Sequence, residues 1–339
     1  WYWTNFLNMN KILVTGGAGY IGSHTLVELS QNGFTPIVVD NLSNTSIENL
    51  KGAEKIIDKK IPFYKIDCTN ESEFKKVFET EDNIKGVIHF AAFKSVEESV
   101  REPEKYFNNN IGSLEVLLKL MKDFGINNII FSSSCTVYGS PDVLPVNESA
   151  PFKKAESPYG ESKQICEKLL NKVDLNSVSL RYFNPIGSHE SGLIGDCSYD
   201  KASNLVPIIT ETAIGIREQI TVFGDDYNTP DGTCLRDYIH VVDLANAHVK
   251  ALNYVISNGN KSVFNIGTGK GVSVLEAIHI FEEVNELQIN FKIGPRRAGD
   301  VEQIYSDNTL STNELKWKAK MPLENAMKSA WKWEQQKTR

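Results

Sequence analysis

The sequence predicts an α/β protein with a doubly wound parallel sheet and a smaller C-terminal lobe. Three observations lead to this prediction. Short apolar runs alternate with helical patterns through the first half, glycines follow the first apolar run, and Pro, Gly and Asp become dense after Asn184. Such alternation favours parallel strands joined by right-handed crossovers. With 339 residues, the chain is long enough for two unequal lobes.

The first elements follow from apolar periodicity. Residues 11–15 form a short apolar run, a helical pattern runs from Tyr20 to about Asn32, and Gly33 ends it. Residues 35–40 predict a second strand with Asp40 at its end. Further strands are predicted at 63–66, 86–90, 128–132 and 178–181, and helices at 71–78, 106–124 and 162–171.

The chain is therefore divided into residues 9–184, the sheet-containing lobe, and residues 185–339, mainly a second lobe. Helical patterns recur at 244–256 and 274–283, and we expect 237–256 to return to the first lobe. Residues 1–8 lack the basic region and cleavage site of a signal peptide, so we interpret them as a non-native extension before Met9.

Composition excludes several classes of partner. The formal net charge of -7 argues against nonspecific binding to nucleic acid or to an anionic membrane, although a few local arginines could still hold a phosphate. The five cysteines form no CxxC pair, which predicts no metal site and suits a reducing, cytoplasmic compartment. No apolar run approaches the roughly 18 residues of a membrane span.

A glycine-rich turn connects the first strand to the first helix. Residues 16–22 read GGAGYIG, a spacing that lets the backbone approach a pyrophosphate at a helix N-terminus. Asp40 ends the next strand, where a carboxylate accepts hydrogen bonds from ribose hydroxyls and repels a 2′-phosphate. Alone, each feature also fits an ordinary turn. Together they predict a Rossmann-type domain that binds NAD rather than NADP.

A catalytic pair is predicted at Tyr159 and Lys163, which are four residues apart on one helix face. Lowering a phenol's pKa from about 10 to about 7 requires roughly 4 kcal/mol. One cation at about 4–6 Å supplies about 3–4 kcal/mol at an effective dielectric near 20. Lys163 with the positive nicotinamide ring could therefore make Tyr159 a base. Ser132 to Ser134 follow an apolar strand, and Ser134 is the best candidate to bind the reacting oxygen.

These motifs resemble the extended short-chain dehydrogenase/reductase family, and from about residue 9 to 333 they resemble its UDP-sugar 4-epimerases. The most specific segments are VTGGAGYIGSH (14–24), VVDNL (38–42), HFAA (89–92), SSSCTVYG (132–139), SPYG (157–160), LRYFNP (180–185), RDYIH (236–240) and PRRAGD (295–300). The resemblance implies NAD-dependent interconversion of UDP-galactose and UDP-glucose. Tyr159 would take the C4 hydroxyl proton, and a 4-keto sugar would rotate before re-reduction.

The resemblance also assigns binding positions. Cofactor contacts are implied for Gly16, Gly19, Tyr20, Ile21, Gly22, Asp40, Asn41, Asp67, Cys68, Phe90, Ala91, Lys94, Asn109, Ser132, Tyr159, Lys163 and Tyr182. Substrate contacts are implied for Ser134, Asn184, Asn204, Phe223, Arg236, Arg297, Asp300 and Ile304. The two arginines suit a diphosphate and Phe223 suits uracil, whereas Ile304 would limit the sugar's 2-substituent. A homodimer through the helix at 106–124 is expected by resemblance.

Two other functions would share parts of this sequence pattern. A 4,6-dehydratase needs an additional acid and base, commonly an Asp-Glu pair after the Ser-rich strand, but Cys135 and Thr136 stand there. A nonenzymatic NAD sensor could dispense with Tyr159 and Lys163, yet both are present. Action on UDP-uronic acids or UDP-N-acetylhexosamines stays open because loops decide the sugar.

Overall fold

The computed structural model describes residues 10–197, 202–297 and 300–337, so the predicted extension at 1–8 lies outside the described residues. A seven-stranded sheet forms the larger lobe, in the order β11-β6-β5-β4-β1-β2-β3. Every neighbouring pair in it is parallel. The order reverses between β1 and β4, which is where such sheets bind ligands at their carboxyl ends.

The predicted α/β class is confirmed by this sheet. Its strands are β1 (Lys11–Thr15), β2 (Thr35–Val39), β3 (Phe63–Tyr64), β4 (Ile84–His89), β5 (Asn128–Ser134), β6 (Asn176–Tyr182) and β11 (Lys261–Ile266). Its helices are α1 (Tyr20–Gln31), α2 (Glu48–Ile57), α3 (Glu71–Thr80), α4 (Val96–Arg101), α5 (Pro103–Asp123), α6 (Pro158–Lys172) and α8 (Val241–Asn258).

Alternation along the strands builds a hydrophobic core on each face of the sheet. Ile12 and Val14 pack in a cluster with side chains of α1, α2 and α8. Leu13 points the other way, into a cluster with side chains of α3, α5 and α6. Strand side chains alternate between faces, so both faces of a sheet covered by helices read as apolar.

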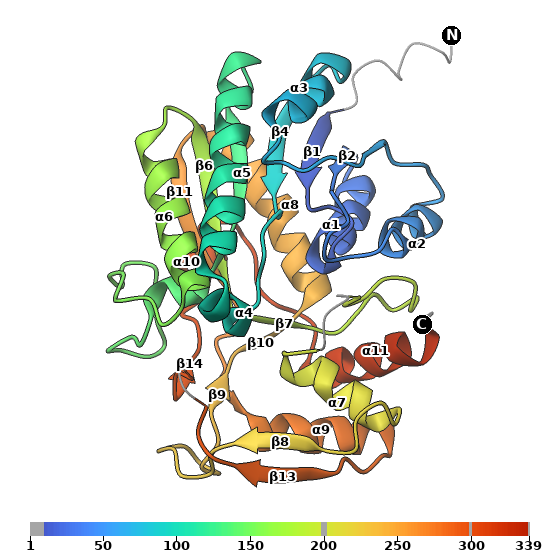
Figure 1. Cartoon of the computed structure of the whole chain (residues 1–339), viewed down its shortest axis with the longest axis vertical. Helices are drawn as coiled ribbons and strands as arrows, with labels where there is room; N and C mark the ends of the chain where they lie inside the picture. The colour runs from blue at the N-terminus through green and yellow to red at the C-terminus, as the bar shows by residue number, and fades with distance from the viewer. Residues whose placement is uncertain (1–9, 198–201, 298–299, 338–339) are drawn as a thin grey trace.

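The smaller lobe lies below the sheet in Figure 1 and packs around α9, α7 and α11. Its strands are β7 (Asn184–Ile186), β8 (Ile220–Phe223), β9 (Leu235–Arg236), β10 (Tyr238–His240), β12 (Val272–Ser273), β13 (Phe291–Gly294) and β14 (Gln303–Ile304). Its helices are α7 (Leu205–Ala213), α9 (Val274–Asn285) and α11 (Leu323–Gln336), whereas α10 (Thr309–Glu314) packs against β11 of the larger lobe. Among the described residues, no helix is both long and apolar enough to cross a membrane.

The chain's return to the larger lobe is longer than the expected 237–256. Helix α8 packs in the core cluster of α1, and the chain then continues into β11, which pairs with β6 at the sheet edge. Residues 261–266 thus belong to the sheet, although they lie within the segment assigned mainly to the second lobe. Helices α2 and α4 were not predicted either.

Candidate active site

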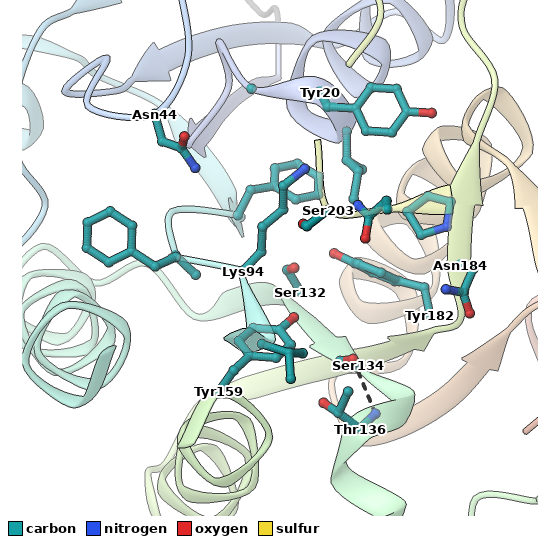
Figure 2. A pocket seen from close by; sticks show the side chains of 18 of the residues that line it. Tyr20, Asn44, Lys94, Ser132, Ser134, Thr136, Tyr159, Tyr182, Asn184 and Ser203 are labelled. Carbon is teal, nitrogen blue, oxygen red and sulfur yellow. Dashed lines mark hydrogen bonds between the residues drawn. The ribbon is translucent and has the colours of Figure 1, made fainter. Parts of the chain in front are cut away.

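One cavity of about 440 Å³ joins the two lobes at the carboxyl ends of the strands. Its walls come from the glycine turn, the ends of β4, β5 and β6, the first turn of α6, and the small lobe. Figure 2 shows Tyr159, Ser132, Ser134 and Tyr182 around the same part of this cavity.

The glycine turn packs closely against the backbone that follows β4. Gly16 has φ +70°, and a Cβ there would come within 2.8 Å of the Ala91 amide nitrogen. The N-cap residue Gly19 offers no side chain to the first turn of α1, so those amide groups stay available. A bound pyrophosphate would accept their hydrogen bonds and meet the positive end of the helix.

Asp40 is hydrogen-bonded to the glycine turn. Its Oδ2 accepts a hydrogen bond from Ala18 N at 3.1 Å, and its Oδ1 accepts one from Leu42 N at 2.9 Å. Burial raises the pKa of Asp40, and these two amides partly oppose that rise. Each carboxylate oxygen has further acceptor capacity for ribose hydroxyls. The residues therefore fit the adenosine half of NAD.

The first turn of α6 carries Tyr159, the predicted base. Ser157 caps this helix by accepting a hydrogen bond from Gly160 N at 3.1 Å, and Pro158 stands in the first turn. Tyr159 consequently faces the cavity, beside the hydroxyls that end β5 (Figure 2). One turn on, Lys163 Nζ donates to the carbonyl oxygen of Ser132 at 2.6 Å.

The pKa values of Tyr159 and Lys163 differ from those expected from the sequence. Burial raises the pKa of Tyr159 to about 12, and a hydrogen bond with Ser134 opposes the rise. Burial also lowers the pKa of Lys163 from 10.5 to about 8. Attraction between the two charges lowers the pKa of the phenol, but the cost of removing the phenolate from water raises it by more. A base near neutrality thus needs more stabilisation than Lys163 supplies.

Thr136 is a site residue that the sequence reasoning did not assign. Its Oγ1 is buried without a hydrogen-bond partner among the described residues, and its side chain lines the cavity. Figure 2 shows it beside Ser134, whose Oγ accepts a hydrogen bond from Thr136 N at 3.2 Å. Its place two residues past the Ser-rich strand end was the available signal, since that segment had already been assigned to the site.

The small lobe contributes a cationic end. Arg297 donates from Nε and NH2 to Asp300 at 3.1 and 2.8 Å, and Arg236 NH2 lies 3.7 Å from the same carboxylate. The Arg297 guanidinium is 5.4 Å from the ring centroid of Phe223, which is 39% exposed. Two cations share one anion, so this end of the cavity favours an anionic group beside an aromatic surface.

The structure brings together nearly all of the predicted positions. Every residue assigned to the cofactor or the substrate lines the cavity except Ile304. Ile304 is only 5% exposed and packs in a cluster with Cys135 and Phe183, which do line the cavity. Its side chain therefore lies behind the cavity wall, on a strand that pairs with β9.

Comparison with known proteins agrees with this geometry. The family model for GDP-mannose 4,6 dehydratase matches residues 13–330. The UDP-glucose 4-epimerase of Dictyostelium discoideum is 46% identical, with 96% of each chain covered. That of Pasteurella multocida is 45% identical, covering 95% of this chain and 97% of its own.

Solved structures give the same result. A UDP-glucose-4-epimerase from Stenotrophomonas maltophila with bound NAD and formylated UDP-arabinopyranose superposes with a TM-score of 0.93, at 43% identity over 97% of this chain and 98% of that one. The Bifidobacterium longum enzyme with NAD+ and UDP gives 0.91, at 42% identity over 96% and 98%. The chain therefore belongs to the extended short-chain dehydrogenase/reductase family and, within it, to the UDP-glucose 4-epimerases.

Proposed function

We propose that this protein interconverts UDP-galactose and UDP-glucose by oxidising the sugar at C4, letting the 4-keto sugar rotate, and reducing it from the other face. One observation carries the proposal: a single cavity joins the dinucleotide turn, the Tyr159–Lys163 pair and the arginine end. Such an arrangement would place a cofactor, a base and a nucleotide anchor around one sugar. The reaction has no net redox change, so the cofactor need not leave.

NAD is the cofactor that the residues fit. The glycine turn would hold its pyrophosphate, Asp40 its adenosine ribose, and Lys163 and Tyr182 the nicotinamide half. When bound, NAD supplies the hydride acceptor and donor for C4, together with a positive ring near Tyr159. Asp40 would repel the 2′-phosphate of NADP.

Tyr159 is the proposed base and acid. Bringing its pKa from about 12 to about 7 requires roughly 7 kcal/mol. Lys163 alone supplies only part of this, since a cation at about 6 Å is worth roughly 3 kcal/mol at an effective dielectric of 20. The hydroxyls of Ser134 and Thr136 would bind sugar oxygens and help to hold the negative charge.

Arg236, Arg297 and Phe223 would anchor the nucleotide while the sugar turns. Arginine forks bind phosphate oxygens in pairs, and an aromatic face suits uracil. Asn184 and Asn204 are placed to bind sugar and phosphate oxygens between this anchor and Tyr159. A nucleotide fixed at one end lets the 4-keto sugar present either face without release.

A 4,6-dehydratase is the second candidate, because the matching family model is named for one. Among the described residues, the carboxylates that line the cavity are Asp40, Asp67 and Asp300. The first two lie at the proposed cofactor end, and Asp300 is paired with arginine. None follows Ser134, where Cys135 and Thr136 stand, so the epimerase is favoured.

The deciding experiment incubates the purified protein with UDP-galactose and no added NAD. UDP-glucose should form. The reverse reaction, started from UDP-glucose, should form UDP-galactose. A 4-keto-6-deoxy product would establish the dehydratase instead. Lack of turnover with either hexose, together with turnover of a UDP-uronic acid, would move the proposal to that substrate class.

We also infer that the protein forms a homodimer through α5. We infer a cytoplasmic location as well. Val96 and Val100 on the neighbouring helix α4 are 45% and 61% exposed, which leaves apolar surface beside α5. Light scattering after size-exclusion chromatography would test the dimer, and Val100→Glu should weaken it. A monomer at micromolar concentration would contradict this inference.

A further inference from the structure

A buried ion pair lies directly behind the catalytic strand end. Arg181 donates to both carboxylate oxygens of Glu167, from Nε to Oε1 at 3.0 Å and from NH2 to Oε2 at 2.6 Å. The two side chains are only 6% and 2% exposed. Two fully desolvated charges are costly unless every lone pair and proton is satisfied, so such a pair demands precise geometry.

Glu167 connects this pair to the catalytic residues. It lies on α6, one turn after Lys163 and two turns after Tyr159. Its Oε1 also accepts a hydrogen bond from the hydroxyl of Ser133 on β5. Ser133 is the residue between Ser132, whose carbonyl binds Lys163, and Ser134, whose hydroxyl faces Tyr159.

Alternation along β5 separates the serines that line the cavity from the serine that contacts the ion pair. Ser132 and Ser134 line the cavity, whereas Ser133 does not and points to the opposite side. On the neighbouring strand, Arg181 is the register partner of Ser133, and Tyr182 is that of Ser134. The residues that face the cavity therefore alternate with residues of the ion-pair network.

The network extends away from the cavity and fixes Arg181. Its guanidinium lies 4.9 Å from the ring centroid of Tyr138 and 5.1 Å from that of Phe152. Its NH1 donates to Tyr138 OH at 3.0 Å, and that hydroxyl donates to Asn265 Oδ1 on β11 at 2.6 Å. The guanidinium thus lies near two aromatic rings and donates a hydrogen bond from each of its nitrogens.

We propose that Glu167 is a positioning residue: through Ser133 and Arg181 it fixes α6 against β5 and β6, and so sets Tyr159 relative to Ser134. This inference rests on the proposed epimerase function. Among the described residues, the other side-chain hydrogen bonds that join α6 to β5 are made by Lys163, to Ser132 O, and by Tyr159, to Ser134. Without Glu167, apolar packing would remain, but the side-chain hydrogen bonds between this helix and β5 would come only from Tyr159 and Lys163, the proposed catalytic groups.

Ser133→Ala tests this with little disturbance, since it keeps the ion pair and removes only the link to β5. We expect kcat to fall about tenfold, less than the roughly 100-fold that a 1 Å misplacement can cost. The KM for UDP-galactose and the bound NAD per protomer should not change. Ser133→Thr retains the hydroxyl on a residue that favours strands, and should restore kcat.

Glu167→Gln should lower kcat more than Ser133→Ala does. Because it leaves the buried Arg181 without its charged partner, the melting temperature of this variant is measured first. Ser179→Ala is the control, a buried serine of β6 outside the network, and should keep wild-type kcat. A lower melting temperature with unchanged kcat in Ser133→Ala, beside an active wild type, would overturn this inference alone. An inactive wild type would overturn the proposed function as well.

Discussion

Replacing Lys163 by methionine separates the residue's charge from its bulk. Methionine has a similar length and no charge, and Lys163 is almost fully buried. Its Nζ lies 5.8 Å from the ring centroid of Tyr159. At an effective dielectric of 20, a cation at that distance stabilises the phenolate by about 3 kcal/mol. Loss of this amount corresponds to a fall of about 100-fold in kcat.

The same substitution should not weaken the fold. The pKa of Lys163 is lowered from 10.5 to about 8 in the folded protein. A base with a lowered folded pKa destabilises the protein while it is protonated in both states, here by about 3 kcal/mol below pH 8. Its hydrogen bond to Ser132 O returns about 1.5–3 kcal/mol. We expect Lys163→Met to equal the wild type at pH 7 or to exceed it by up to about 2 kcal/mol.

The sign of the pH dependence follows from the two pKa values. The lysine's cost is complete below about pH 8, fades as the pH rises through 10.5, and is absent above 10.5, where the lysine is neutral in both states. Between pH 7 and pH 10, the free energy of unfolding of Lys163→Met should therefore fall relative to that of the wild type. Urea unfolding at each pH, with NAD content recorded, measures this shift.

Two results would refute the reasoning. A kcat within about threefold of wild type would show that the charge of Lys163 does not stabilise the base. A stability difference that stays constant between pH 7 and pH 10 would show that burial does not depress the lysine's pKa. Loss of NAD with normal kcat at saturating NAD would confine Lys163 to cofactor binding.

Three further changes test other parts of the site. Tyr159→Phe should lower kcat by about 100- to 10,000-fold and keep bound NAD, measured by acid release and chromatography; near-normal turnover would exclude it as the base. Arg297→Ala should weaken UDP binding by about 1.5 kcal/mol, the low end for a charged hydrogen bond because the side chain is half exposed, and calorimetry that finds normal affinity would remove it from the diphosphate site. Asp40→Asn turns an amide group toward Ala18 N or Leu42 N, so bound NAD should fall and NADP should compete better; unchanged NAD selectivity would contradict the assigned role.

Local pattern predicted the elements whose apolar period or capping is strong, and it failed where distant packing decides. Helix α2 was missed because Gly52 interrupts its pattern and lowers helix propensity. A side chain at Gly52 would overlap the carbonyl of Leu193 and the side chain of Ile194, so the glycine is required by tertiary contact. Strand β11 was missed for a related reason, since only its pairing with β6 separates it from the surrounding lobe.

The candidate site was predictable where motifs are short and local, and not where its support comes from several strands. Tyr159 and Lys163 could be assigned because they form a compact motif on one predicted helix, and Ser134 because it follows a predicted strand; all three line the cavity. Glu167 was not, since a glutamate four residues after a lysine on a helix ordinarily reads as an exposed pair. Only the fold turns that helix face toward Arg181 and makes the same spacing a buried contact.

Ile304 is the position where resemblance and structure differ most, and it gives the last prediction. Because Ile304 packs behind Cys135 and Phe183, it acts on a sugar's 2-substituent only by moving this wall. Ile304→Ser should leave space into which the wall relaxes, so kcat/KM for UDP-N-acetylgalactosamine should rise relative to UDP-galactose while the melting temperature falls. Ile304→Tyr should overpack the cluster and lower both activities. Val146→Ala is the control. Val146 belongs to the same cluster but does not line the cavity, so its truncation leaves a similar space away from the site. An equal change of the kcat/KM ratio in Val146→Ala and Ile304→Ser would show that softening of this cluster, and no gate at Ile304, sets the sugar range.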